Sequence, residues 1–143
     1  MRFPAYMVLS LALLTSACGG SDTATSPSAT TTTPSSVTER FDAILGPGAS
    51  TFYSFTVSTG GTVSINLASL SPLDRPGLLP VTMEIGYGTP AGEACSVQKA
   101  MQTVPGLTSQ LTDTLTAGTY CANLADIGNL KQAANFSIRI THP

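Results

Sequence analysis

Residues 51–67 read TFYSFTVSTGGTVSINL, with two runs of alternating apolar and polar side chains on either side of Gly60 and Gly61. Successive side chains of a β-strand point to opposite faces, so this alternation predicts two strands that each bury one face. The side chains expected on the buried faces are Tyr53, Phe55, Val57, Val63, Ile65 and Leu67. Two such runs joined through Gly-Gly are typical of a β-hairpin, which we therefore predict here.

The same two-residue period recurs along the rest of the chain. Clear runs cover residues 81–87, 118–124 and 135–141, and weaker runs cover residues 39–45, 95–103 and 110–115. Glycine, proline and asparagine separate the runs, and no long 3.6-residue period follows the N-terminal segment. About eight short strands over roughly 105 residues predict an all-β fold, an antiparallel β-sandwich.

The N-terminal segment has the composition of a secretory signal. Arg2 supplies a positive charge, residues 5–14 form a short apolar stretch, and the small residues Ser16 and Ala17 precede Cys18. The apolar stretch is shorter than the roughly 20 residues that a transmembrane helix needs. A buried core helix is the alternative, but the Ser/Thr/Pro-rich sequence that follows does not favour it.

The residues around Cys18 resemble the lipobox of bacterial lipoproteins. Ala17 is the small residue that this signal places before its cysteine, whereas Thr15 stands where leucine is usual. The resemblance implies a mature chain that begins at Cys18 and is anchored by two or three acyl chains. Gly19 replaces the aspartate of the common inner-membrane retention signal, so we expect an exported protein in the outer membrane, facing the periplasm or the cell surface. Ordinary signal cleavage with a free Cys18 is the alternative.

Three segments of the chain follow from this interpretation. Residues 1–17 are expected to be the lipoprotein signal peptide, residues 18–38 the lipidated N-terminus and linker, and residues 39–143 the folded domain. The linker is rich in Ser, Thr and Pro and has too little apolar content to form a core. It would span roughly 25 Å as a coil and about 60 Å when extended, which would hold the domain away from the bilayer.

Cys95 and Cys121 remain once Cys18 is assigned to the lipid. An even number of cysteines in an exported chain favours a disulfide between them. In the chain-entropy model, a bridge that closes about 26 residues adds about 3 kcal/mol to the stability. A metal or redox role is the alternative, but the sequence has no CxxC motif and a single histidine.

The composition does not favour nucleic-acid binding or catalysis. Six basic and eight acidic side chains give a net charge of −2, with no basic patch. There is no GxSxG motif, and the single histidine, His142, stands beside the C-terminus, where chains are often frayed. Glu84 is expected on a solvated outer face, and Glu93 and Asp113 lie near expected turns without evident partners. We therefore expect a protein that is not an enzyme and holds no cofactor.

Three stretches, in order and spacing, resemble the bacterial pre-peptidase C-terminal domain. They are the two runs of residues 53–67 around their Gly-Gly turn, residues 81–87, and Ala117-Gly118-Thr119-Tyr120 with the closing run 136–140. The resemblance covers residues 39–142. It implies a small, jelly-roll-like β-sandwich of a kind often appended to secreted peptidases.

The residues by which members of that family bind their ligands have no clear counterpart in this sequence. Some members bind calcium through clustered acidic residues, but Glu39, Asp42 and Asp74 do not form the dense run of oxygen ligands that calcium needs. Other members bind collagen or polysaccharide through exposed aromatic rings. Here tryptophan is absent. The tyrosines of the domain all fall on faces with an apolar pattern: Tyr53, Tyr87 and Tyr120.

The function expected from the sequence is that of a non-catalytic, membrane-anchored lipoprotein. Its β-sandwich would present an interaction surface to a protein or another component of the cell envelope. Residues 71–80 and 93–110 are the candidate binding segments, because loops at the ends of sandwiches commonly carry recognition; alternatively, both only connect strands. Lys99 and Lys131 read as isolated surface charges. A carbohydrate-binding module for peptidoglycan or polysaccharide is the alternative function, and a small hydrolase is a third hypothesis.

Overall fold

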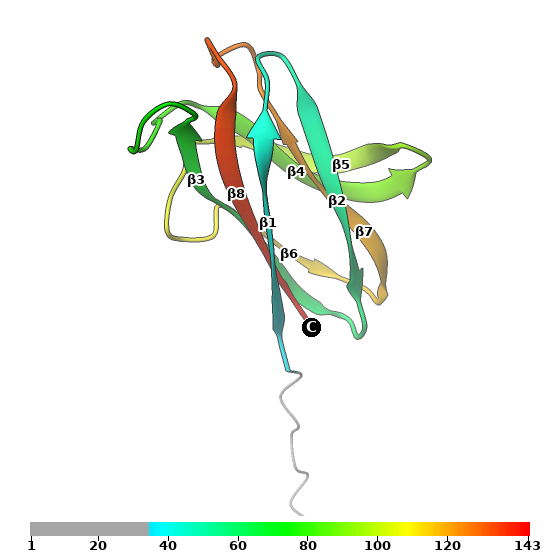
Figure 1. The fold of residues 1–143 in the computed structure, drawn as a ribbon. Coiled ribbons are helices and arrows are strands. Elements are labelled where there is room, and N and C mark those ends of the chain that lie inside the picture. The colour runs from blue at the N-terminus through cyan, green and yellow to red at the C-terminus, as the bar shows by residue number, and fades with distance from the viewer. Residues whose placement is uncertain (1–34) are drawn as a thin grey trace, which may run out of the picture. The chain divides into compact units, whose positions relative to one another are not determined.

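The computed structural model describes residues 35–143, so Cys18, the signal peptide and most of the linker lie outside the described residues. Eight antiparallel strands form two four-stranded sheets packed as a sandwich (Figure 1), which confirms the predicted all-β fold. The strands are β1 (Val37–Leu45), β2 (Ser50–Val57), β3 (Gly61–Pro72), β4 (Met83–Ala91), β5 (Ala94–Thr103), β6 (Leu111–Leu115), β7 (Gly118–Ala125) and β8 (Ala134–His142). In this part of the chain no helix is long and apolar enough to cross a membrane.

The strand order of the two sheets is that of a jelly roll. One sheet has the order β1-β8-β3-β6, and the other has the order β2-β7-β4-β5. The strand pairs are nested, because β1 pairs with β8, β2 with β7, β3 with β6 and β4 with β5. A long hairpin that folds over on itself gives this nesting, and it confirms the jelly-roll-like architecture.

The predicted hairpin between residues 51–57 and 62–67 is wrong. These runs are β2 and β3, which lie in different sheets. Two-residue hairpin turns need a positive φ at a central residue, and neither Gly60 nor Gly61 has one. The tight hairpin joins β4 to β5, where Gly92 has a φ of 64° between the paired residues Ala91 and Ala94. Alternation shows which face of a strand is buried, but it does not identify the partner strand.

The core lies between the two sheets and contains the side chains that the alternation placed there. Phe55, Val57, Val63, Ile65 and Leu67 are all at most 2% exposed, and Tyr53 packs against them as a half-buried ring. Burial of each such side chain contributes about 1.5–3 kcal/mol. The hydrophobic effect therefore accounts for most of the stability of the sandwich.

Aromatic and covalent contacts close the two sides of the sandwich. At the β1–β2 side, the rings of Phe41 and Tyr53 stack with their centroids 4.3 Å apart. The predicted disulfide is present, and it joins Cys95 of β5 to Cys121 of β7, whose Cα atoms are 5.9 Å apart. β4 lies between these two strands, so the bridge passes over Gly88, which pairs with Cys121. The disulfide therefore holds the β4–β5 hairpin against its own sheet.

Candidate functional site

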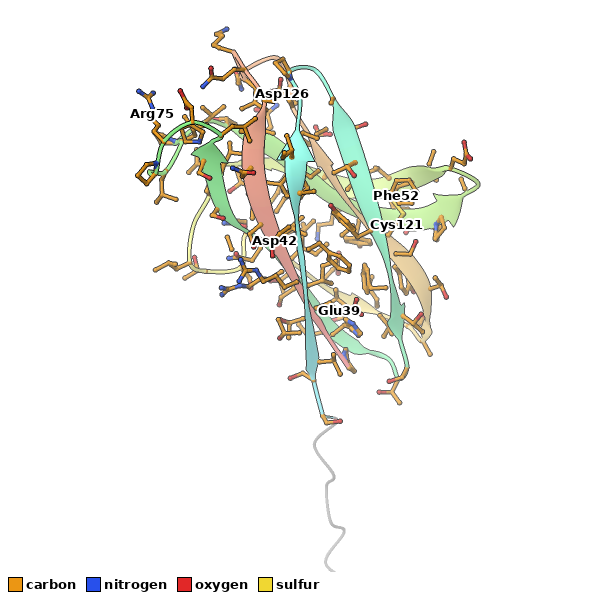
Figure 2. All side chains as sticks on the ribbon, in the orientation of Figure 1. Glu39, Asp42, Phe52, Arg75, Cys121 and Asp126 are labelled. Atoms are coloured by element: carbon orange, nitrogen blue, oxygen red, sulfur yellow. A yellow bond between two sulfur atoms is a disulfide. The ribbon has the colours of Figure 1, made fainter. Side chains whose placement is uncertain are left out.

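The two candidate binding segments differ in structure. Residues 94–103 form the regular strand β5, so only the end of the segment 93–110 is a loop. The loop after β3 carries Arg75, which Figure 2 shows at one end of the sandwich. Arg75, Leu79 and Lys131 line a cavity of about 200 Å³ there. The larger cavities lie on the outer face of a sheet, which the sequence analysis did not single out.

On the outer face of the first sheet, paired residues of β1, β8 and β3 form four rows of three side chains each. Eleven of these twelve side chains are polar or charged. We call these twelve residues the polar face. Its four rows are Thr38, Thr141 and Ser64; Arg40, Arg139 and Asn66; Asp42, Ser137 and Ser69; and Ile44, Asn135 and Ser71. The opposite faces of the same strands supply the core residues. The polar alternation of these strands therefore creates a continuous hydrogen-bonding surface.

Two cavities hollow the polar face. One, of about 410 Å³, is lined by Arg40, Asp42, Ile44, Ser69 and Asn135 together with the neighbouring Ala43 and Phe136. The other, which we call the Asn66 pocket, has a volume of about 230 Å³. It is lined by Thr38, Ser64, Asn66, Leu107, Ser109, Arg139 and Thr141. These cavities supply the concave surface that a bound ligand needs.

The loop of residues 104–110 forms one wall of the Asn66 pocket and is tightly hydrogen bonded to β3. The Asn66 Nδ2 group donates to the carbonyl oxygens of Gly106, at 3.1 Å, and Thr108. The Gln110 Oε1 atom accepts from the Leu67 backbone N–H at 2.8 Å. Leu107 projects from this loop and is 94% exposed. The wall is thus held in place at its base, while an apolar side chain stands free at its rim.

The charges of the polar face do not balance. Arg40 forms an ion pair with Asp42 at 2.9 Å and donates a hydrogen bond to the Ser137 hydroxyl at 3.1 Å. Hydrogen bonds from Ser137 and Arg40 hold the pKa of Asp42 below its ordinary value of 3.8. Arg139 lies directly opposite Arg40 in the register, and among the described residues it has no ion-pair or hydrogen-bond partner. Like charges opposite one another destabilise a sheet, and this pair leaves one positive charge without a close counter-ion.

The buried His142 contacts the partly exposed Glu39 at the end of the sandwich that holds the C-terminus. The expectation of a frayed C-terminus is wrong, because β8 continues to His142, whose side chain is almost fully buried. Its Nε2 atom lies 2.9 Å from the Glu39 Oε1 atom, and its ring packs on Phe55 with the centroids 5.4 Å apart. The only histidine of the chain is therefore part of the core.

Asp113 and Lys99 have partners that the sequence did not reveal. Asp113 lies within β6, not in a turn, and its Oδ2 atom accepts hydrogen bonds from the Tyr87 hydroxyl and the Lys99 ammonium, both at 2.7 Å. The bond to Asp113 raises the pKa of Tyr87 to about 12. Lys99 and Tyr87 lower the pKa of Asp113 to about 2. A tyrosine whose ring is predicted to be buried needs a hydrogen-bond partner for its hydroxyl. This requirement was the signal in the sequence that Tyr87 has a polar partner such as Asp113.

The acidic residues that the sequence analysis considered as calcium ligands do not lie close together in the structure. Glu39 and Asp42 are three residues apart in β1 and therefore lie on its opposite faces, and Asp74 lies in the loop after β3. Figure 2 labels Glu39 and Asp42 at separate places along β1. Within residues 35–143, no group of three or more histidine, cysteine, aspartate or glutamate side chains is placed to hold a metal ion.

Asp126 is a buried carboxylate that the sequence analysis did not consider. Burial raises its pKa, but backbone N–H groups of Gly48, Leu130 and Asn129 outweigh this effect and lower the pKa below 3.8. The Gly48 bond is 2.7 Å long. Asp126 therefore ties the β1–β2 turn to the loop after β7, which is a structural role.

Comparison of this chain with protein families and with curated proteins gave no match. The resemblance to the pre-peptidase C-terminal domain therefore stays a prediction.

Proposed function

We propose that this chain is a non-catalytic, membrane-anchored lipoprotein whose sandwich binds a component of the cell envelope through the polar face. The observation that carries this proposal is the row Arg40, Arg139 and Asn66, in which two cations share one nearby carboxylate, that of Asp42. Like charges opposite one another cost stability in the free protein, and an anionic ligand bound beside them would relieve that cost.

A binding role also agrees with the contacts of the side chains that could act in catalysis. His142 is bonded to Glu39, and Asp113 is bonded to Tyr87 and Lys99. Asp42 is paired with Arg40. These acidic and imidazole groups are engaged within the protein, whereas Arg139 of the polar face is exposed and has no ion-pair or hydrogen-bond partner among the described residues.

The anchor is tested at Cys18. We expect Cys18→Ser to move the protein from the membrane fraction to the soluble fraction, because without acyl chains the protein loses about 0.8 kcal/mol per buried methylene group. Fractionation after a high-salt wash, with Ser21→Ala as the matched control, measures the change. A Cys18→Ser protein that still sediments with the membranes would show that the anchor proposal is wrong.

The polar face is tested by photo-crosslinking in cells. A photoreactive amino acid replaces Asn135 on the polar face or, as a control, Thr56, which is exposed on the outer face of the other sheet. We expect a discrete adduct with an envelope component from position 135 and none from position 56. Adducts at both positions, or only at position 56, would contradict binding through the polar face.

A further inference from the structure

Asn66 holds a buried hydrogen-bond acceptor for which the fold supplies no donor. Its side chain amide nitrogen uses both hydrogens, one for Gly106 and one for Thr108, so the orientation of the amide is fixed. The residue is only 6% exposed, and within the described part of the chain its Oδ1 atom has no partner. Buried acceptors are almost always paired in folded proteins, so an unpaired one requires an explanation.

The surroundings of Asn66 define the chemistry of the missing partner. Arg139 is its direct neighbour on β8 and is the unpaired cation of the polar face. Thr38, Ser64 and Ser109 add hydroxyl groups to the wall of the same pocket. The pocket therefore needs a ligand that donates a hydrogen bond to Asn66, carries a negative charge for Arg139, and exchanges hydrogen bonds with hydroxyl groups.

We propose that the Asn66 pocket binds a carboxylate-bearing sugar residue of an acidic polysaccharide. The proposal rests on the proposed binding role of the polar face and names its ligand class. A sugar hydroxyl donates to the Asn66 Oδ1 atom, and the sugar carboxylate accepts from the Arg139 guanidinium, which forms paired, charge-assisted hydrogen bonds with carboxylates.

The size of the pocket agrees with this ligand. Its volume of about 230 Å³ is below the ~300–1,000 Å³ of sites for drug-sized molecules, and it suits one sugar ring. The second cavity of the polar face, of about 410 Å³, provides room for further residues of the same saccharide. Since the Asn66 Oδ1 atom is closed to solvent, the ligand enters by displacing neighbouring side chains. Leu107 and Arg139 are exposed, and exposed side chains change rotamer readily.

An acidic peptide is the competing ligand, and the structure favours it less. Acidic peptides are held through a sheet edge, through apolar pockets for their side chains, or through a cluster of arginines. The polar face is the outer surface of a sheet and not its edge, and only Ile44 among its twelve residues is apolar. It also lacks a cluster of free arginines, because Arg40 is paired with Asp42. A surface of hydroxyl, amide and guanidinium groups matches the hydroxyl-rich edge of a saccharide better.

Calorimetric titration of the purified full-length protein tests the proposal. The probes are tetramers of galacturonic acid and of mannuronic acid, with their methyl esters as controls that keep the hydroxyl groups but lose the charge. A glutamate tetramer tests the peptide alternative. We expect at least one acidic tetramer to bind, its methyl ester to bind at least tenfold more weakly, and the glutamate tetramer to bind no better than the ester.

Variants locate the site. Arg139→Gln should weaken binding of the acidic tetramer at least tenfold, and Thr38→Val should weaken it by a smaller factor. Lys131→Gln removes a charge at the other end of the sandwich and should change the affinity less than twofold. Equal binding of acid and ester, better binding of the glutamate tetramer, no binding of either acid, or an unchanged affinity in Arg139→Gln would overturn the proposal.

The two proposals fail in different ways. If the tetramers do not bind but crosslinking at position 135 still captures an envelope component, the acidic-saccharide assignment fails and the binding role of the polar face stands. If neither crosslinks nor saccharide binding are found, both fail. The anchor at Cys18 is measured independently by fractionation.

Discussion

At the scale of single residues, hydrogen bonds to Asp113 link the two sheets at one side of the sandwich. Tyr87 and Lys99 belong to the sheet of β4 and β5, whereas Asp113 belongs to β6 of the other sheet. The ring of Tyr87 is largely buried, and its hydroxyl would lack a partner in an apolar core. Alternation along β4 placed the ring inside, but only the packing of one sheet on the other supplies the carboxylate.

We expect Asp113→Asn to lower the pKa of Tyr87 from about 12 towards its ordinary 10.0, because the charged acceptor that stabilises the protonated phenol is lost. Tyrosine absorbance followed as a function of pH measures this change, with Asp74→Asn as a control in an exposed loop. A wild-type titration in which every tyrosine ionises near pH 10 would contradict the assignment.

The pKa values of Tyr87 and Asp113 make the free energy of unfolding depend on pH at both ends of the pH scale. The folded pKa of Tyr87 lies above its ordinary value, so its contribution is complete below pH 10 and is lost as the pH rises towards 12. The folded pKa of Asp113 lies below 3.8, so its contribution is present above that pH and is lost as the pH falls towards 2. Asp113→Asn should remove both pH dependences from the unfolding midpoint.

At the scale of elements, a glycine and a disulfide hold the β4–β5 hairpin in place. The register between these strands shifts between Tyr87 and Gly88, where β5 carries one extra residue in a β-bulge. A Cβ atom at Gly88 would overlap the carbonyl oxygen of Ser96. The sequence marks the turn of this hairpin with Gly92, but the close approach at Gly88 lies beside the bulge and has no signature in the local pattern.

We expect Gly88→Ala to destabilise the protein by about 1–3 kcal/mol, because the added methyl group meets backbone atoms that cannot rotate away. Gly46→Ala is the matched control, since nothing lies within 4 Å of a Cβ atom there. Its effect should stay within about 0.5 kcal/mol. Urea unfolding of both variants gives the free energies, and equal stability of the two would refute the overlap.

The disulfide between β5 and β7 makes a second contribution to the stability of this hairpin. In the Cys18→Ser chain, thiol labelling without reductant should modify no cysteine, and labelling after reduction and unfolding should modify Cys95 and Cys121. Replacing both by alanine should lower the free energy of unfolding by about 3 kcal/mol. Ready labelling of either cysteine in the oxidised, folded protein would contradict the bridge.

At the scale of the whole molecule, the nested pairing brings the start of β1 beside the end of the chain. Val37 pairs with His142. Figure 1 shows the start of β1 at the end of the sandwich where C marks the C-terminus. The β2–β3 connection reaches the same place, where the Ser58 N–H donates to the Pro143 carbonyl oxygen at 3.2 Å. A Cβ atom at Gly61 would lie 2.7 Å from the Pro143 ring, so this glycine makes room for the C-terminus.

We expect truncation after Thr141 to lower the free energy of unfolding by about 2–4 kcal/mol. The truncation removes the His142 ring from Phe55 and leaves the Ser58 N–H and the Glu39 carboxylate without these partners. Chemical denaturation measures the loss, and Glu39→Gln, which keeps an acceptor for the ring, is the milder control. An unchanged midpoint would show that the C-terminus is frayed after all.

The sequence alone determined the number and approximate positions of the eight strands, their buried faces, the pairing of Cys95 with Cys121 and the sandwich class. These features depend on side-chain periodicity, turn residues and cysteine count, all of which are local or countable. Strand partners could not be read in this way, because an alternating run buries the same face whichever strand lies beside it. The β2–β3 hairpin was wrong for this reason.

Only the tertiary structure decided the arrangement of the residues in the proposed binding site. Arg40, Arg139 and Asn66 come from three strands that are far apart in the sequence, and each looks like an ordinary outward-facing polar residue by itself. Register across β1, β8 and β3 aligns them in one row, and the loop of residues 104–110 buries the Asn66 oxygen without supplying a donor. A site of this kind is made by strand order, and strand order is set by the packing of the whole chain.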